Sequence, residues 1–109
     1  VDALYNTLLL RFADPELSLA EELRREPYSP THLRRLYKEQ IGCSPMETLM
    51  ALRIRRAKTL LADENGLPVS VAQVAALSGF PDPYYFSRIF KQYVGCSPRE
   101  YRRSVAGKR

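Results

Sequence analysis

The tetrapeptide Gly42-Cys43-Ser44-Pro45 returns 53 residues later as Gly95-Cys96-Ser97-Pro98. The similarity continues upstream of both copies at the same offset: Leu33 with Phe86, Leu36 with Ile89, Tyr37 with Phe90, Lys38 with Lys91 and Ile41 with Val94. Further upstream the offset becomes 52, because one residue is added near the prolines at 81 and 83. A period this long, present only twice, is typical of a duplicated helical unit rather than of a solenoid, which needs at least three shorter repeats.

Each copy carries three signals for the start of a helix. A hydroxyl followed three residues later by Glu or Gln is a capping box, and a cap residue before proline marks a first helical turn. The signals are Ser18 with Glu21, Ser29-Pro30 and Ser44-Pro45-Met46-Glu47 in the first copy, and Ser70 with Gln73, Asp82-Pro83 and Ser97-Pro98-Arg99-Glu100 in the second. Each copy is therefore predicted to hold a short helix, a turn and a longer helix, which is the helix-turn-helix arrangement.

Two further helices are expected outside these pairs. Apolar residues at helical spacing predict a packing helix that ends before Pro15: Val1, Leu4, Tyr5, Leu8, Leu9 and Phe12. Residues 45–62 predict a long helix that joins the two copies, and turn residues follow it at 63–68. No window alternates with the period of a strand, so the chain is predicted to be all-α. The expected division is 1–44 for the packing helix and first helix-turn-helix subdomain, 45–62 for the linking helix, and 63–109 for the second subdomain.

The second helix of each pair presents a polar face with no acidic side chain. Inward positions are predicted to be Leu33, Leu36, Tyr37 and Ile41 in the first copy, and Phe86, Ile89, Phe90 and Val94 in the second. The opposite faces hold Thr31, Arg34, Arg35 and Lys38, and Tyr84, Ser87, Arg88 and Lys91. An α-helix fits the major groove of DNA, where an Arg fork can bind guanine and a hydroxyl can meet several base edges. Because a solvated face usually mixes charge signs, the repetition favours contact with double-stranded DNA.

The charge balance points the same way. There are 17 Lys and Arg against 12 Asp and Glu, for a net charge of +5, and a pI near 9.5. Residues 1–17 carry −2 and the remainder +7, so the basic character belongs to the duplicated part. The 18 residues of the predicted linking helix span roughly 27 Å. Successive major-groove segments on one face of DNA lie about 34 Å apart. Two head-to-tail copies are therefore expected to read one asymmetric site of roughly two turns.

The chain closely resembles the C-terminal DNA-binding domain of AraC/XylS-type bacterial transcription regulators. The stretches that carry the resemblance are GF at 79–80, YFSRIFK at 85–91, GCSP at 95–98, EYRR at 100–103, HLRRLYK at 32–38 and RIRRAKTLL at 53–61. The resemblance implies seven helices, with two homeodomain-like helix-turn-helix subdomains joined by a long helix. It also implies sequence-specific binding of double-stranded DNA, RNA polymerase as a further partner, and a separate effector or dimerisation domain on the N-terminal side. A cytoplasmic location is expected because the sequence shows neither a membrane span nor a secretion signal.

The resemblance assigns roles residue by residue. Base contacts are implied for Thr31, Arg34 and Arg35 in the first copy and for Tyr84, Ser87 and Arg88 in the second. Phosphate contacts, which fix register without reading sequence, are implied for His32, Lys38, Tyr85 and Lys91. The first copy departs from the family where Leu23 and Pro27 replace the Ala75 and Gly79 of the second, and this change is expected to alter the angle of its first helix.

Other functions receive less support from the sequence. His32 is the only histidine and the glycines are scattered, so no catalytic triad, metal cluster or phosphate loop is predicted, and no cofactor or enzyme activity is expected. The two cysteines occupy equivalent places in the repeat and are expected to stay free. Arg53, Arg55, Arg56 and Lys58 are candidates for phosphate contacts, solvated positions or ion pairs to Glu22 or Glu26. The alternative function is a basic helical module that docks an acidic protein partner, and RNA binding is a third candidate. No apolar stretch is long enough for a membrane span.

Overall fold

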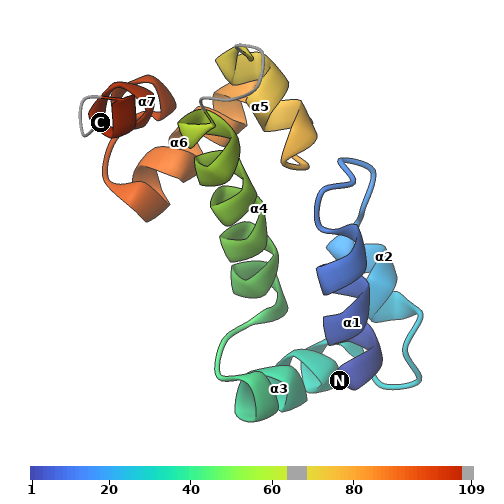
Figure 1. The fold of residues 1–109 in the computed structure, drawn as a ribbon. Helices are drawn as coiled ribbons and strands as arrows, with labels where there is room; N and C mark the ends of the chain where they lie inside the picture. The colour runs from blue at the N-terminus through green and yellow to red at the C-terminus, as the bar shows by residue number, and fades with distance from the viewer. Residues whose placement is uncertain (64–68, 107–109) are drawn as a thin grey trace.

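The computed structural model describes residues 1–63 and 69–106, and these residues form seven α-helices and no strand. The helices are α1 (Asp2–Arg11), α2 (Leu19–Arg24), α3 (Pro30–Ile41), α4 (Pro45–Ala62), α5 (Val71–Leu77), α6 (Pro83–Val94) and α7 (Pro98–Ala106). The molecule is elongated, with extents of 48 × 24 × 23 Å. Helix α4 runs between the two groups of helices, α1–α3 at one end and α5–α7 at the other (Figure 1). The predicted all-α fold is confirmed.

The helices begin where the sequence predicted. Ser29 and Asp82 accept hydrogen bonds from the first turns of α3 and α6, and a proline follows each cap. Complete capping boxes open three helices: Ser44 with Glu47, Ser70 with Gln73 and Ser97 with Glu100. At α2 the prediction is met only in half. Ser18 accepts from the Glu21 amide at 3.3 Å, but within the described part of the chain the Ser18 amide donates no bond to the Glu21 carboxylate.

The two longer helices of the repeat also end alike. Gly42 follows α3 with φ 99°, and Gly95 follows α6 with φ 96°. This left-handed conformation strains residues that carry a Cβ, so glycine is the natural residue at the position. Each glycine amide bonds back to a lysine carbonyl at 2.9 Å, Lys38 in one copy and Lys91 in the other. The duplicated tetrapeptide is therefore a helix stop followed by a helix start.

The buried apolar residues form one cluster that extends along α4 into both subdomains. In the first, Leu23, Leu33 and Tyr37 are fully buried. In the second, aromatic rings follow one another: the centroids of Phe80 and Phe86 are 5.0 Å apart, and those of Phe86 and Phe90 are 5.7 Å apart. The predicted inward faces are confirmed. Ile41, Ile89 and Val94 pack at the edge of the core while partly exposed, and Leu36 is half-buried.

The buried apolar face of α1 is narrower than the sequence predicts. Leu4 and Leu8 are buried, but the side chain of Leu9 is 41% exposed, so the prediction that Leu9 faces the core is wrong. The helix ends at Arg11, before Pro15, as expected. The fully buried residues of α1 are Leu4 and Leu8, which lie four apart on one side of the helix.

Cys43 and Cys96 are both free, as predicted, and each is half-buried at the junction after its helix. The Cys43 sulfur lies 3.3 Å from the hydroxyl oxygen of Thr48. The described residues include no helix long and apolar enough to cross a membrane.

Candidate DNA interface

Helix α3 presents its predicted polar face to solvent. Thr31, Arg34, Arg35 and Lys38 are all exposed, whereas Leu33 and Tyr37 on the opposite side are buried. The arrangement follows from the helical period, because residues three and four apart share a face. One helix surface therefore offers a hydroxyl, two guanidinium groups and an ammonium group together.

His32 lies beside this surface and contacts one of its arginines. Nη2 of Arg35 is 2.9 Å from Nδ1 of His32, and the ring of Tyr28 is 5.5 Å from the imidazole. Since guanidinium nitrogens only donate, Nδ1 is the acceptor and the imidazole hydrogen sits on Nε2. The half-buried His32 thus keeps one donor for a phosphate oxygen, while the Arg35 side chain is drawn toward the start of α3.

Helix α6 presents the matching surface in the second subdomain. Tyr84 is 85% exposed, Arg88 and Lys91 are exposed, and Ser87 is half-buried. The cap residue Asp82 is acidic, but its carboxylate accepts the backbone amide of Tyr84 at 2.9 Å and so belongs to the helix start. The four predicted residues therefore share one accessible face.

Tyr85 and Arg88 are positioned by contacts with aromatic rings. The ring of Tyr85 lies 6.1 Å from that of buried Phe80, and Cζ of Arg88 lies 5.3 Å from the centroid of Tyr85. A guanidinium over an aromatic face is an attractive cation–π arrangement. The core therefore supports Tyr85, and Tyr85 in turn supports the guanidinium predicted to read a base.

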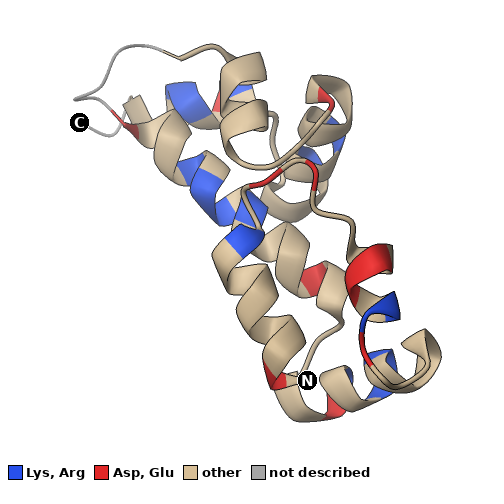
Figure 2. Cartoon of the chain, turned by 90° about the vertical axis from the view of Figure 1, so that its right-hand side faces the viewer, with Lys and Arg blue, Asp and Glu red and all other residues tan. Residues whose placement is uncertain are grey.

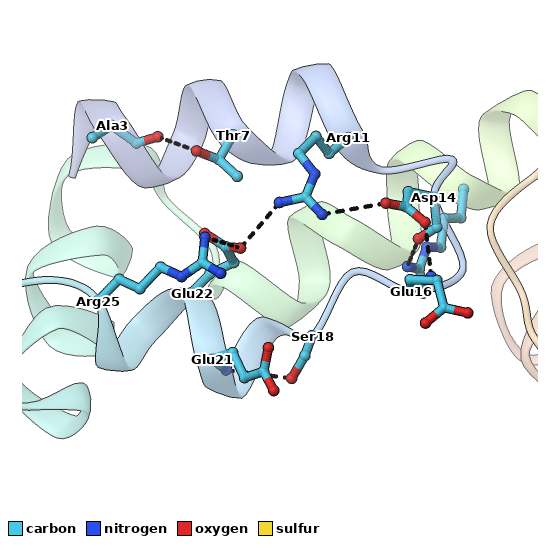
Figure 3. Close-up of polar contacts among 10 residues, drawn as sticks. Ala3, Thr7, Arg11, Asp14, Glu16, Ser18, Glu21, Glu22 and Arg25 are labelled. Carbon is cyan, nitrogen blue, oxygen red and sulfur yellow. Dashed lines mark hydrogen bonds and ion pairs between the residues drawn. The ribbon is translucent and has the colours of Figure 1, made fainter.

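The ion pairs between described residues lie away from both surfaces. Arg11 bonds to Asp14 and to Glu22, each at 3.2 Å, and Glu22 also pairs with Arg25 at 3.4 Å. Figure 3 shows Arg11 reaching between the two carboxylates from α1. Within the part of the chain that the structure describes, no carboxylate neutralises Arg34, Arg35 or Arg88. The positive charge of the two surfaces is therefore available to a polyanion.

The basic residues of α4 begin at its middle, with Arg53, and continue into its C-terminal half (Figure 2), and most of them bind the protein itself. Arg53 is only 5% exposed, and its Nε donates to the Phe12 carbonyl at 2.8 Å, so the suggestion that it contacts phosphate or solvent is wrong. Nε of Arg56 donates to the Leu77 carbonyl at 2.8 Å, and Nζ of Lys58 lies 5.7 Å from the ring centroid of Tyr101. These contacts cap helix ends and cover a ring rather than pairing with Glu22 or Glu26.

The turns of the two helix pairs differ in how far the aromatic residue that follows each turn is buried. Gly79 has φ 100°, and a Cβ there would collide with the Phe12 carbonyl and approach Nε of Arg53 to 2.8 Å. The aromatic residue after the turn is buried in the second copy, where Phe80 is 1% exposed, but 54% exposed in the first, where it is Tyr28. The exposed Tyr28 ring contacts His32, and the effect of Leu23 and Pro27 on the angle of α2 stays a prediction.

The sequence reading missed Arg99. A surface hollow of about 360 Å³ opens beside the second polar face, between the start of α5, the first turns of α6 and the start of α7. Tyr84, Ser87 and Arg99 all contribute to its lining. Arg99 occupies the place of Met46 in the first copy, so comparing the charges of the two copies is the signal that could have found it.

The described residues were also compared with the requirements of a metal site and of an enclosed binding cavity. Within residues 1–63 and 69–106, no group of three His, Cys, Asp or Glu side chains is placed to hold a metal ion. The polar faces described above are open helix surfaces rather than enclosed cavities.

Known proteins share both the sequence pattern and the fold. The family model described as "Helix-turn-helix domain" matches residues 23–104. The arabinose operon regulatory protein of Escherichia coli is 36% identical over 90 residues, which cover 83% of this chain and 30% of that protein. The transcriptional activator RhaR of Mannheimia succiniciproducens is 36% identical over 87 residues, covering 80% of this chain and 30% of that protein.

A solved structure extends the comparison to the whole fold. The C-terminal domain of AraT, a response regulator from Geobacillus stearothermophilus, superposes with a TM-score of 0.82 at 28% identity, covering 94% of this chain and 83% of that one. The chain spans about a third of the length of the curated relatives that it matches. The family match covers most of the chain, and these relatives share its sequence and fold, so the chain belongs to the AraC/XylS-type family of helix-turn-helix DNA-binding domains.

Proposed function

We propose that the chain binds double-stranded DNA sequence-specifically, as the DNA-binding part of a bacterial transcription regulator in the cytoplasm. One observation carries this proposal. Two equivalent helices, α3 and α6, present exposed polar faces whose arginines are not paired with carboxylates in the described part of the chain. The relatives support it, since their names describe an operon regulatory protein and a transcriptional activator.

The proposed binding mode places α3 and α6 in successive major-groove segments. Thr31, Arg34 and Arg35 contact bases in one groove segment, and Tyr84, Ser87 and Arg88 do so in the next. His32, Lys38, Tyr85 and Lys91 contact phosphates, as does the newly identified Arg99. Helix α4 has 18 residues and is roughly 27 Å long. This is somewhat less than the ~34 Å between groove segments, so DNA bending would take up the difference.

The division of the chain follows from this mode. Residues 1–44 and 63–109 act as the two reading units, and residues 45–62 hold them at a fixed spacing. Because the units follow one another head to tail, the bound site is asymmetric. In a longer regulator, an effector or dimerisation domain would precede this part, and RNA polymerase would be a further partner.

Selection of bound sequences from random duplex DNA tests the proposal. The 109-residue chain is expected to enrich one asymmetric site of roughly two helical turns, with protection over its full length in a footprint. Affinity for that site is expected to fall steeply with salt, because several phosphate contacts release counterions. No enrichment together with a flat salt response would contradict DNA binding and favour an acidic protein partner. Protection of a single half-site would contradict the two-unit mode.

A further inference from the structure

Arg53 lies where the two subdomains meet. It is the ninth of the 18 residues of α4, and its guanidinium is buried between elements from both halves of the chain. On one side Nε donates to the Phe12 carbonyl at 2.8 Å and Nη2 donates to the Asp14 carbonyl at 3.3 Å. Both acceptors belong to the segment that follows α1. The five N–H donors of a planar guanidinium allow one side chain to hold two backbone carbonyls at once.

The other side of the same guanidinium faces the second subdomain. Its Cζ lies 5.8 Å from the ring centroid of Phe80, the buried residue at the turn between α5 and α6. Gly79, next to it, approaches the Phe12 carbonyl and Ala13 so closely that no Cβ fits between them. In Figure 1 the segment after α1 accordingly reaches the end of α5. The segment 12–14, Arg53 and the turn at 79–80 thus form one junction, which we call the Arg53 junction.

The Arg53 junction is connected by side-chain contacts to both helix-turn-helix subdomains, which hold α3 and α6. Phe80 packs against Phe86 of α6 and against Tyr85, which carries Arg88. The segment after α1 is tied to α2 because Arg11 bonds to both Asp14 and Glu22. A displacement of the turn at 79–80 would therefore move α6 and its polar face. A displacement of the segment 12–14 would move α2 and, with it, the first subdomain.

We propose that Arg53 is a positioning residue that fixes the angle between the two helix-turn-helix subdomains, and thereby the spacing of the two half-sites that the chain accepts. The inference rests on the proposed DNA binding for its functional consequence, but not for its structural part. Replacing Arg53 by Gln leaves the carbonyls of Phe12 and Asp14 without their guanidinium donor and removes the charge from the Phe80 ring. Helix α4 remains continuous, so the subdomains stay connected but less strictly oriented.

Electron spin resonance on labelled protein tests the structural part without DNA. Glu39 and Gln92 are exposed, equivalent positions of α3 and α6, and both can be changed to Cys for spin labels once Cys43 and Cys96 are replaced by Ala. The distance distribution between the labels is expected to be narrow with Arg53 and broader with Arg53→Gln. Arg55→Gln is the matched control, since it removes the same charge from an exposed place on the same helix. Equal widths for all three proteins would overturn the proposal.

A spacing assay tests the functional part on the site enriched by the wild-type protein. Two base pairs inserted between the half-sites move the second one by about 7 Å and turn it by about 70°. The wild type and Arg55→Gln are expected to lose on the order of 100-fold in affinity on insertion, and Arg53→Gln about tenfold or less. An equal loss for all three proteins would overturn the proposal. Failure of the wild type to enrich any site would instead contradict the proposed function, and the label distances would still judge the junction.

A separate measurement distinguishes a variant that is unfolded from one that is folded but has differently oriented subdomains. Urea unfolding of each variant establishes that it is folded under assay conditions. Should Arg53→Gln not fold, Arg53→Lys carries the same two measurements, because it keeps the charge but lacks the fork that binds two carbonyls. An Arg53→Lys protein with wild-type label distances and wild-type spacing preference would overturn the proposal.

Discussion

The hydroxyl of Tyr37 donates a 2.7 Å hydrogen bond to Oγ1 of Thr48, which joins α3 to α4 inside the first subdomain. Both residues are buried, and burial raises the pKa of Tyr37, so the phenol stays protonated and remains a donor. At the equivalent positions of the second subdomain, an aromatic contact takes the place of this hydrogen bond. Phe90 stands in the place of Tyr37 and packs edge-on against Tyr101, with centroids 5.6 Å apart.

Tyr37→Phe is expected to lower the free energy of unfolding by about 1 kcal/mol, because it removes one buried hydrogen bond without leaving a cavity. Urea unfolding at neutral pH measures the change. Tyr5→Phe is the matched control, since the Tyr5 ring lies 6.4 Å from that of Tyr37 while its hydroxyl has no hydrogen-bond partner among the described residues. A loss of stability in Tyr5→Phe equal to that in Tyr37→Phe would show that the bond to Thr48 is not the cause.

Gly79→Ala is expected to destabilise the protein more than Gly95→Ala. Both glycines have positive φ, near 100° and 96°, so each substitution imposes backbone strain of about 1–2 kcal/mol. Only at Gly79 does the new Cβ also meet the Phe12 carbonyl, whereas nothing lies within 4 Å of a Cβ at Gly95. The difference between the two unfolding free energies therefore measures the close approach at the Arg53 junction. Equal losses of unfolding free energy in the two variants would mean that the Arg53 junction accommodates the new Cβ at no cost in stability.

Acid is expected to destabilise the protein partly through two capping boxes. Hydrogen bonds from Ser44 and Ser97 lower the pKa of Glu47 and of Glu100 below the ordinary value of 4.5. A carboxylate with a lowered folded-state pKa stabilises the fold above its unfolded pKa, and this stabilisation is lost as pH falls through the folded-state value. Unfolding measured from about pH 5 downward should show the decline.

The control for this pH dependence is built into the chain. Gln73 performs the same capping role at α5 with an amide in place of a carboxylate. The double variant Glu47→Gln, Glu100→Gln is therefore expected to keep its caps and to show a shallower fall of stability with acid. An unchanged slope would assign the acid sensitivity to other carboxylates, such as that of Asp14, whose pKa is lowered by the Glu16 amide and by Arg11.

The sequence predicted the helices well because their boundaries are local. Caps such as Ser44 with Glu47 and the glycine stops at 42 and 95 act within one turn, so a short stretch of residues decides them. The outward faces of α3 and α6 followed from the helical period alone. Arg53 was misjudged because its partners, Phe12 and Asp14, lie about 40 residues away and are backbone carbonyls, which no side-chain pattern reveals. Leu9 was misjudged because periodicity gives the direction of a face but not its width.

Arg88 and Lys91 provide the test of base reading against phosphate contact, since both are exposed on the same face of α6. Arg88→Ala is expected to lose about 1–3 kcal/mol of binding at the selected site and to relax preference at one base pair, because its fork reads one base. Lys91→Ala is expected to weaken all duplexes alike and to reduce the salt slope by about one, because it contacts a phosphate. Fluorescence anisotropy on the selected site and its single-base variants, at several salt concentrations, separates the two outcomes. A uniform loss across all duplexes in Arg88→Ala would mean that the guanidinium held over Tyr85 binds the DNA backbone and reads no base.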